Sequence, residues 1–505
     1  MGDQYTVFMA NQDEGLVRHL LRRTGFGAKA EDVPQFIGMT RGEAADKLLG
    51  FKGKAFKPSG RYIEDAHNKW VKYMIKTSLV VQEKLVLYWH HHFATSYDKV
   101  QNVKLMGQQI RLFHAMCNGR FNDFVKQMNR NAALMEFLDT VRNHKDIPNE
   151  NYGRELQELF TLGVTDLNGH PNYTQEDIVQ IARAFTGGDY IYNSGEAVFH
   201  DYDHDYMAAF PERQWKTIYK STGQFGAGGK AYAMPIDPND QNLPPMYTPP
   251  APPPDTTDAV TEGSTEIDAV IDIIFKHKDS DGQSTVARRV ARKLLEYYGR
   301  AIPLPASTAD KAVIDQVISD SGFDTNWEIT GLVRAILVND FFYETATVPP
   351  FDASTQKSVK WPIDYVVSTM RLLHTKLKGK YQYVDGGDYK AIRDQLANMG
   401  QILLEPPSVF GWDWETAWLS SATLLARYDF ARDVTSAFDV GNVLSISSLT
   451  SDEIVTAVTD ILGVTDQLSA TEHNALVNYL NNTPDDMRLR GLFVLALQSP
   501  AYQLH

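Results

Sequence analysis

Three consecutive histidines, His90 to His92, follow an apolar segment of the chain and are the first candidates for chemistry. Histidine is the commonest transition-metal ligand, and its neutral ring can also act as a catalytic base. Adjacent residues of an α-helix point about 100° apart, so three successive side chains cannot all reach one ion. His90 and His92 could converge only if the helix ends there, and the segment after His92 allows this. A metal ligand, a catalytic base and a buried, hydrogen-bonded imidazole are therefore alternative roles for His92.

A second group of candidates lies within residues 149–158, which have helical spacing. On an α-helix, Asn151, Glu155 and Glu158 lie at i, i+4 and i+7, so both carboxylates point the same way. The helix is otherwise apolar, and burying a charge without a partner is costly. The partner could be Arg183, a histidine or a cation. Di-metal sites of helical bundles use Glu-x-x-His, whereas this segment has Glu-x-x-Glu, so the match is partial. A buried salt-bridge network with an arginine is the alternative.

A third group contains acidic residues at alternate positions. Asp201, Asp203 and Asp205 are spaced as in a calcium-binding loop, with Glu212 at the twelfth position. However, a tyrosine occupies the position where that loop requires glycine, so an EF-hand is disfavoured. The alternatives are a looser metal cluster with His200 or His204 and a solvated acidic loop.

The composition limits the ligands and partners of these candidates. The chain has 49 Lys and Arg against 63 Asp and Glu, a formal net charge of −14, which argues against binding of nucleic acid. Cys117 is the only cysteine, which excludes an intrachain disulfide and a cysteine-rich zinc or iron–sulfur site. Any metal must therefore be held by imidazole and carboxylate. No segment has the roughly 20 apolar residues of a membrane span, and the sequence as it stands predicts a cytoplasmic protein.

Helices are predicted to position most of these residues. Apolar residues recur at helical spacing through 61–92, and a further helix is predicted over 151–162, ended by Gly163. Thr40 with Glu43, and Thr174 with Asp177, have the spacing of capping boxes that begin helices. Another helix is predicted over residues 285–298, with a basic flank formed by Arg288, Arg289, Arg292 and Lys293.

The fold predicted from this pattern is mostly α, a large single multi-helix domain with a small irregular or β insertion. The chain divides into an N-terminal helical part with the His and Glu motifs (1–188), the insertion (189–265) and a C-terminal helical part (266–505). We expect the two helical parts to pack as one body. Within the insertion, residues 190–199 and 217–225 are predicted to form a small hairpin, and the proline-rich stretch 235–254 an extended loop.

Several ordered blocks of the chain resemble the bacterial family called domain of unknown function 1800. These blocks are residues 20–27, 82–96, 149–163, 182–187, 199–201 and 406–412. The resemblance runs nearly from end to end, and it implies little about activity. It implies that relatives are often exported and that their genes often lie beside one for a sulfatase-like protein, which would be the partner. This chain departs from the family in lacking an evident signal segment and in carrying the proline-rich stretch.

His200 and Asp201 fall within one of these blocks, so we give them more weight than the acidic residues after them. We predict that six residues converge on one polar centre and bind a metal: His90, His92, Glu155, Glu158, His200 and Asp201. The leading hypothesis is a metal-dependent enzyme with His92 and Glu155 as catalytic residues. Imidazole and carboxylate suit zinc, iron or manganese, and the acidic loop would suit calcium. The alternatives are a non-catalytic scaffold or binding protein, stabilised by calcium and acting with a partner, and a metal-free hydrolase with His92 as base.

Overall fold

The structure is a computed structural model in which the described residues are 8, 13–205, 217–219, 230–233, 256–259, 263–346, 358–374, 389–436, 444, 446 and 448–504. These residues form a mostly α, single-domain fold with a small β part, as predicted. Glu212 and the proline-rich stretch 235–254 lie outside the described residues. Within the described part of the chain, no helix is both long enough and apolar enough to span a membrane.

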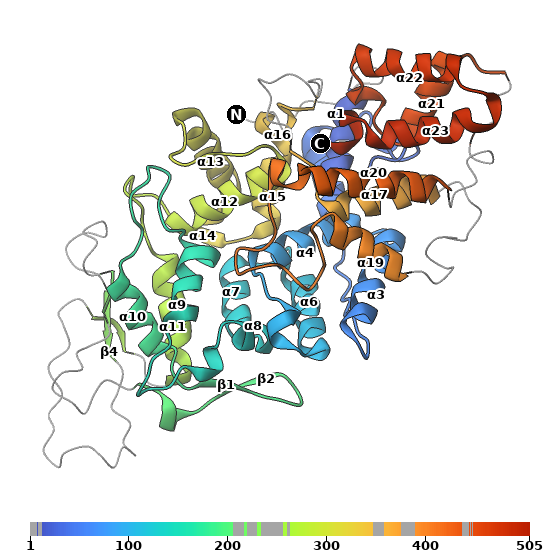
Figure 1. Ribbon diagram of the computed structural model, residues 1–505. Helices are drawn as coiled ribbons and strands as arrows, with labels where there is room; N and C mark the ends of the chain where they lie inside the picture. Colours follow the sequence, from blue (N-terminus) through green and yellow to red (C-terminus); the bar gives the residue numbers. More distant parts are fainter. Residues whose placement is uncertain are drawn as a thin grey trace, which may run out of the picture.

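The N-terminal part consists of short helices joined by tight turns (Figure 1). They are α1 (Glu14–Thr24), η1 (Val33–Gln35), α2 (Arg41–Leu49), α3 (Ile63–Lys76), α4 (Val80–His92), α5 (Tyr97–Val100), α6 (Val103–Met116), α7 (Phe121–Asn129), α8 (Ala132–Phe137), η2 (Thr140–Arg142), α9 (Glu150–Glu155), the π-helix η3 (Leu156–Thr161) and α10 (Gln175–Ala184). Both predicted capping boxes are present: Thr40 begins α2 with Glu43, and Thr174 begins α10 with Asp177.

The C-terminal part is also helical. Its helices are α11 (Gly263–Phe275), α12 (Thr285–Tyr298), α13 (Thr308–Ser321), α14 (Phe323–Asn326), α15 (Ile329–Val338), α16 (Asp340–Tyr343), α17 (Pro362–His374), α19 (Tyr389–Asn398), η5 (Glu415–Leu419), α20 (Ser421–Ser436), α21 (Ser451–Ile461), η7 (Thr465–Gln467), α22 (Ala470–Asn482), α23 (Asp485–Gln498) and α24 (Pro500–Gln503). Helix α12 has the bounds that the sequence predicted.

Helix α4 lies at the centre of the molecule, with α6, α7 and α17 around it (Figure 1). Every residue of α4 from Val81 to His92 is buried, which is the pattern of a helix covered on all sides. Several of these buried residues are polar, so their hydrogen-bonding groups need partners from the surrounding elements. The central position of α4 explains why its three histidines meet parts of the chain that are far apart in sequence.

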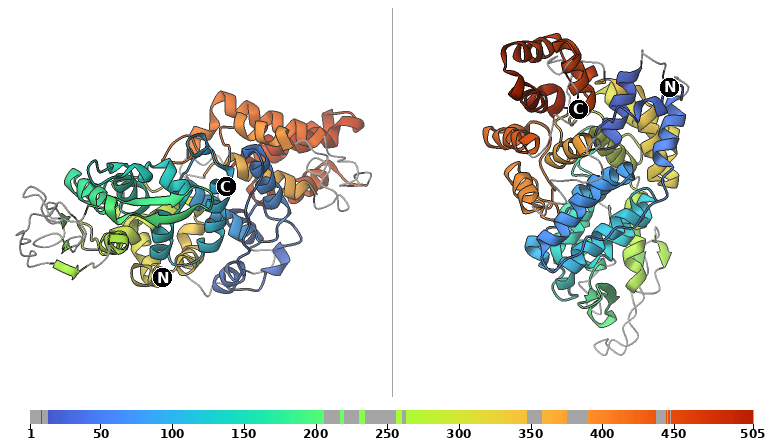
Figure 2. Two further views of the ribbon diagram at one scale, coloured as in Figure 1. Left: turned by 90° about the horizontal axis from the view of Figure 1, so that it is seen from below. Right: turned by 90° about the vertical axis from the view of Figure 1, so that its right-hand side faces the viewer.

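The two helical parts pack against each other in one body (Figures 1 and 2). Helix α2 packs on α15, α3 on α17 and α19, and α1 on η7. Ion pairs join α1 to η7 and α21: the Arg22 guanidinium lies 2.8 Å from Asp466 of η7, and that of Arg18 lies 2.5 Å from Asp460 of α21. The buried hydrophobic side chains form one core that extends from Phe8 to Tyr502.

The β structure differs from the predicted hairpin. Strand β1 (Gly188–Ile191) pairs antiparallel with β2 (Glu196–Phe199), so the hairpin lies wholly within residues 188–199. The turn between the strands is tight, because the amides of residues 194 and 195 both donate to the Ile191 carbonyl. The next strand, β3 (Thr217–Ile218), pairs instead with β4 (Lys230–Ala233), which pairs with β5 (Thr256–Ala259). The predicted pairing of residues 190–199 with 217–225 was therefore wrong.

Candidate functional site

The three histidines of α4 point to three different parts of the molecule. His90 accepts a hydrogen bond from the Leu404 amide at 3.0 Å, and its ring packs against Trp412. His91 Nε2 lies 2.8 Å from the indole nitrogen of Trp414. Burial lowers the pKa of His90 to about 3 and holds the pKa of His91 well below its usual value. Both rings are therefore neutral at physiological pH and tie α4 to the loop that contains residues 404–414.

His92 is placed differently, because it meets another titratable side chain. Its Nε2 lies 3.1 Å from the carbonyl of Phe160, so this nitrogen carries the proton and donates it. Its Nδ1 is then the acceptor, and it lies 3.0 Å from Nζ of Lys293 on α12. Burial, with the charge of Lys293, lowers the pKa of His92 well below its usual value. His92 is thus a neutral ring whose tautomer is fixed by a backbone carbonyl.

Lys293 is half-buried on α12, where the charge of Glu296 on the same helix acts to raise its pKa. Within the described part of the chain, no carboxylate oxygen lies within 4.0 Å of the Lys293 Nζ. Burial lowers its pKa well below the usual value, and the charge of Arg289 one helical turn away lowers it further. An amine in these surroundings has a larger neutral fraction near pH 7 than an ordinary surface lysine.

The Phe160 carbonyl, which accepts the hydrogen bond from His92, belongs to a π-helix. Helix α9 ends at Glu155 and the chain continues as η3, in which the Gln157 carbonyl accepts from the amides of both Leu162 and Gly163 at 2.9 Å. Gly163 has φ of 82°, which favours glycine, and a side chain there would meet Arg289. The sequence predicted one regular helix here. π-Helical turns occur frequently at functional sites.

Two carboxyl groups follow the junction of α9 and η3. Glu155 is 8% exposed, and its Oε2 is buried with no hydrogen-bond partner in the described part of the chain. Burial, together with the charge of Glu158, raises the pKa of Glu155 to about 7. Glu158 accepts a hydrogen bond from the Tyr173 hydroxyl at 3.2 Å. The two carboxyl groups are therefore electrostatically coupled, as their spacing in sequence predicted.

Arg289 contacts the Glu158 backbone, and its charge acts on the His92–Lys293 pair. Its guanidinium lies 3.3 Å from the Glu158 carbonyl, and burial lowers its pKa to about 10. The charge of Arg289 also lowers the pKa of both His92 and Lys293. We call His92, Glu155, Glu158, Arg289 and Lys293 the η3 cluster.

A comparison with protein families identifies the chain. The model of the family described as "Protein of unknown function (DUF1800)" matches residues 19–504. The chain belongs to the DUF1800 family. Searches of curated proteins and of solved structures found no match. The match spans the whole η3 cluster and all six of the predicted site residues, and the family description states no activity.

The last two predicted residues of this DUF1800 chain lie apart from α4 and η3. His200, which follows β2, has Nε2 at 3.3 Å from Asp189, and both side chains are substantially exposed. Asp201 begins the short turn η4 (Asp201–Asp203). The next two acidic residues face different partners, since Asp203 pairs with His144 and Asp205 with Arg183. The alternating aspartates therefore do not point at a common centre.

A buried ionisable pair nearby was not predicted. His204 Nε2 lies 2.6 Å from Glu266 Oε2, and both side chains are completely buried. His204 Nδ1 lies 2.8 Å from the Thr186 carbonyl, so both ring nitrogens face acceptors. Glu266 lies in the first turn of α11. Because the partners are 62 residues apart, their spacing in sequence gave no signal for this pair.

The six predicted residues thus form separate groups in the structure. Glu155 and Glu158 lie together, His92 is linked to Glu158 through Arg289, and His90 and the pair His200 and Asp201 have other neighbours. In the part of the chain that the structure describes, no three His, Cys, Asp or Glu side chains are grouped so that they could hold a metal ion. Metal binding stays a prediction. Lys293 and Arg289, the residues that complete the η3 cluster, were visible in the sequence only as a basic flank.

Proposed function

We propose that this DUF1800 chain is an enzyme that performs acid–base chemistry at the η3 cluster, without a metal in the step itself. The observation that carries the proposal is the His92–Lys293 pair. With Nε2–H fixed on the Phe160 carbonyl, His92 offers Nδ1 only as an acceptor. A neutral Lys293 donates one N–H to this nitrogen and keeps its lone pair for a substrate. Lysines with a lowered pKa are known both as bases and as nucleophiles.

The other members of the cluster complement this role. Glu155, with a pKa of about 7, is half protonated near neutral pH, and among the described residues its Oε2 has no hydrogen-bond partner, so it can donate or accept a proton there. Arg289 and Arg292 flank Lys293 on α12 and supply positive charge. We therefore infer a substrate that carries an anionic or strongly polarised oxygen, with Lys293 as the base and Glu155 as the acid.

The reactivity of the Lys293 amine tests the proposal without a known substrate. Cyanate is small and carbamylates only neutral amines, and the modified lysines can be quantified by peptide mass spectrometry across a pH series. We expect the carbamylation rate of Lys293 to reach its plateau at a pH at least one unit lower than the carbamylation rate of Lys99 does. Lys99 is the matched control, because it is exposed and paired with Asp139. Equal pH profiles for the two lysines would refute the proposal.

A substrate screen then separates catalysis from structure. Any activity found on a panel of esters and oxo acids should fall at least a hundredfold in Lys293→Met and in Glu155→Gln, with circular dichroism unchanged. His92→Phe should lower the pH at which Lys293 becomes reactive, because loss of the Nδ1 acceptor removes a hydrogen bond that favours the charged amine. If the three variants change only thermal stability, the non-catalytic alternative is supported and the enzyme proposal fails.

A second candidate, a metal-assisted enzyme, is favoured by the orphaned oxygen of Glu155 beside Glu158. Two carboxylates and the Tyr173 hydroxyl are hard oxygen ligands, which suit calcium, magnesium or manganese better than zinc. His92 is not available as a ligand in this arrangement, because both of its nitrogens have partners. Elemental analysis of the purified protein decides between the candidates. A stoichiometric metal that is lost in Glu155→Gln with Glu158→Gln, and retained in Glu150→Gln, would favour the metal-assisted version.

A further inference from the structure

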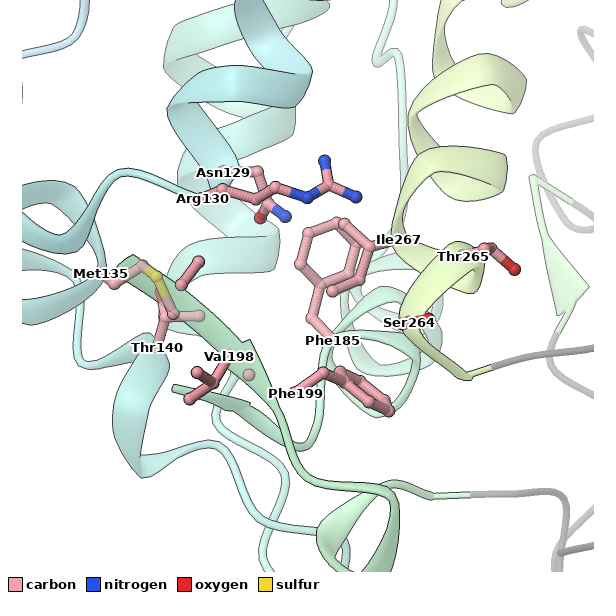
Figure 3. A pocket seen from close by; sticks show the side chains of 12 residues that line it. Asn129, Arg130, Met135, Thr140, Phe185, Val198, Phe199, Ser264, Thr265 and Ile267 are labelled. Atoms are coloured by element: carbon pink, nitrogen blue, oxygen red, sulfur yellow. The ribbon is translucent and has the colours of Figure 1, made fainter. Parts of the chain in front are cut away.

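Two cavities of the molecule differ in the pairing of the arginines that line them. The cavity beside the β1–β2 hairpin has a volume of about 320 Å³ and mainly apolar walls (Figure 3). The guanidinium of Arg130 lines it and lies 2.8 Å from Asp268, so its charge is balanced. A second, smaller pocket lies where the turn after η3 meets α12, and its walls include Arg289 and Arg292.

The guanidinium of Arg289 is half-buried and lacks a close counter-ion. Within the described part of the chain, no carboxylate oxygen lies within 4.0 Å of it, and the charges of Glu296 and Glu158 act on it from farther away. Its Nη2 donates to the Glu158 carbonyl at 3.3 Å. Its Nη1 has no partner among the described residues and is not shut off from solvent. This donor is therefore accessible to a ligand, and a half-buried charge without a partner is costly.

Arg292 supplies a second accessible donor on the same helix. It lies three residues after Arg289 on α12, so the two guanidiniums share a face. Its Nη1 donates to Glu296 Oε1 and to the Ile302 carbonyl, both at 2.8 Å. Its Nη2 has no partner in the described part of the chain and is not shut off from solvent. Burial lowers the pKa of Arg289, and the nearby charge of Arg292 lowers it further, as expected for like charges held close together.

The aspartates in the walls of this pocket are held by other donors. Asp166 accepts hydrogen bonds from three backbone amides. Asp279 lies 2.8 Å from Arg288, the third arginine of the walls. Neither carboxylate neutralises Arg289. The pocket thus holds one positive charge that no close carboxylate balances, together with two guanidinium donors that remain accessible.

We propose that this pocket binds one chloride ion between the guanidiniums of Arg289 and Arg292. The ion would accept hydrogen bonds from Nη1 of Arg289 and Nη2 of Arg292, which are charge-assisted donors. The pocket has about 10 Å³ for the centre of a water-sized group, which is room for one small ion and excludes phosphate or sulfate. A single negative charge also matches the single unbalanced positive charge. The site stands on these contacts and does not depend on the acid–base function proposed for the η3 cluster.

The width of the chloride NMR signal tests the proposal in solution, because chloride held by a protein relaxes faster than free chloride. A chloride titration of the full-length protein gives the affinity. We expect Arg289→Gln and Arg292→Gln each to weaken binding by about tenfold, the ratio that loss of one charge-assisted hydrogen bond supplies. Arg130→Gln is the matched control, since Arg130 lines a cavity but is paired with Asp268, and it should bind chloride as the parent does. Equal broadening by all four proteins would overturn the proposal.

Crystals of the parent protein grown in sodium bromide locate the ion without relying on a variant. Bromide replaces chloride and scatters anomalously, so we expect an anomalous peak in contact with both Arg289 and Arg292. Bromide at other positions alone would show an adventitious ion only and would overturn the assignment.

Discussion

Replacing Glu155 by glutamine tests the electrostatics of the η3 cluster directly. The pKa of Glu155 rises from 4.5 to about 7 in the folded protein, so folding favours the protonated form. The contribution of Glu155 to the free energy of unfolding is fully present below pH 4.5 and is lost as the pH rises through 7, where the buried carboxyl group must ionise. Glutamine cannot ionise and does not suffer this loss. The shift corresponds to at most about 3.4 kcal/mol. Since solvent screens part of the side chain, we expect about 1–2 kcal/mol.

The measurement is urea-induced unfolding of parent and variant at pH 5 and pH 8, at equal ionic strength. The advantage of Glu155→Gln in free energy of unfolding should grow by about 1–2 kcal/mol between the two pH values. Glu158→Gln should reduce this pH dependence, because the charge of Glu158 contributes to the raised pKa. Glu150→Gln is the control on the same helix, since Glu150 is exposed and pairs with Arg154. An advantage that is equal at both pH values would refute the reasoning.

Three further outcomes follow from buried or capped groups. Lys84 lies 2.6 Å from Asp364 with both side chains buried, so Asp364→Ala should lower the free energy of unfolding by about 3–5 kcal/mol, and a change under 1 kcal/mol would contradict the pairing. Cys117 is completely buried and burial raises the pKa of its thiol, so Ellman's reagent should label it only after denaturation. Thr40→Ala should cost about 1 kcal/mol by urea unfolding and Thr40→Ser almost nothing, because the Glu43 amide donates to the Thr40 hydroxyl.

Local patterns predicted the helices well, because the forces that decide them act within a few residues. The capping boxes at Thr40 and Thr174 depend on contacts three residues apart, and both are present. The hairpin prediction failed because the choice between two possible strand partners depends on the turn. The tight turn after Ile191 closes β1 on β2 at once, which leaves Thr217 to pair elsewhere.

The candidate site was predictable only in part. Glu155 and Glu158 were found because their relation is set within one helix, although the π-helical register after Glu155 was not expected. Lys293 was missed as a partner because it lies 201 residues from His92. Two side chains so far apart meet only through the packing of α4 against α12, which composition and spacing do not determine. His200 was predicted to be a metal ligand because it lies in a block that resembles the family. In the structure its partner is Asp189, which lies across the hairpin.

The central helix α4 explains which of the recognisable histidines is the better candidate for chemistry. A buried polar side chain needs a specific partner, and partners from distant segments select one arrangement of those segments. Nε2 of His90 and both ring nitrogens of His91 face the loop of residues 404–414, while the buried Nδ1 of His90 has no partner in the described part of the chain. His92 instead meets Lys293, whose side chain is half-buried. Lys293 supplies the donor that His92 Nδ1 needs and is itself titratable, so the search for activity should begin at this pair.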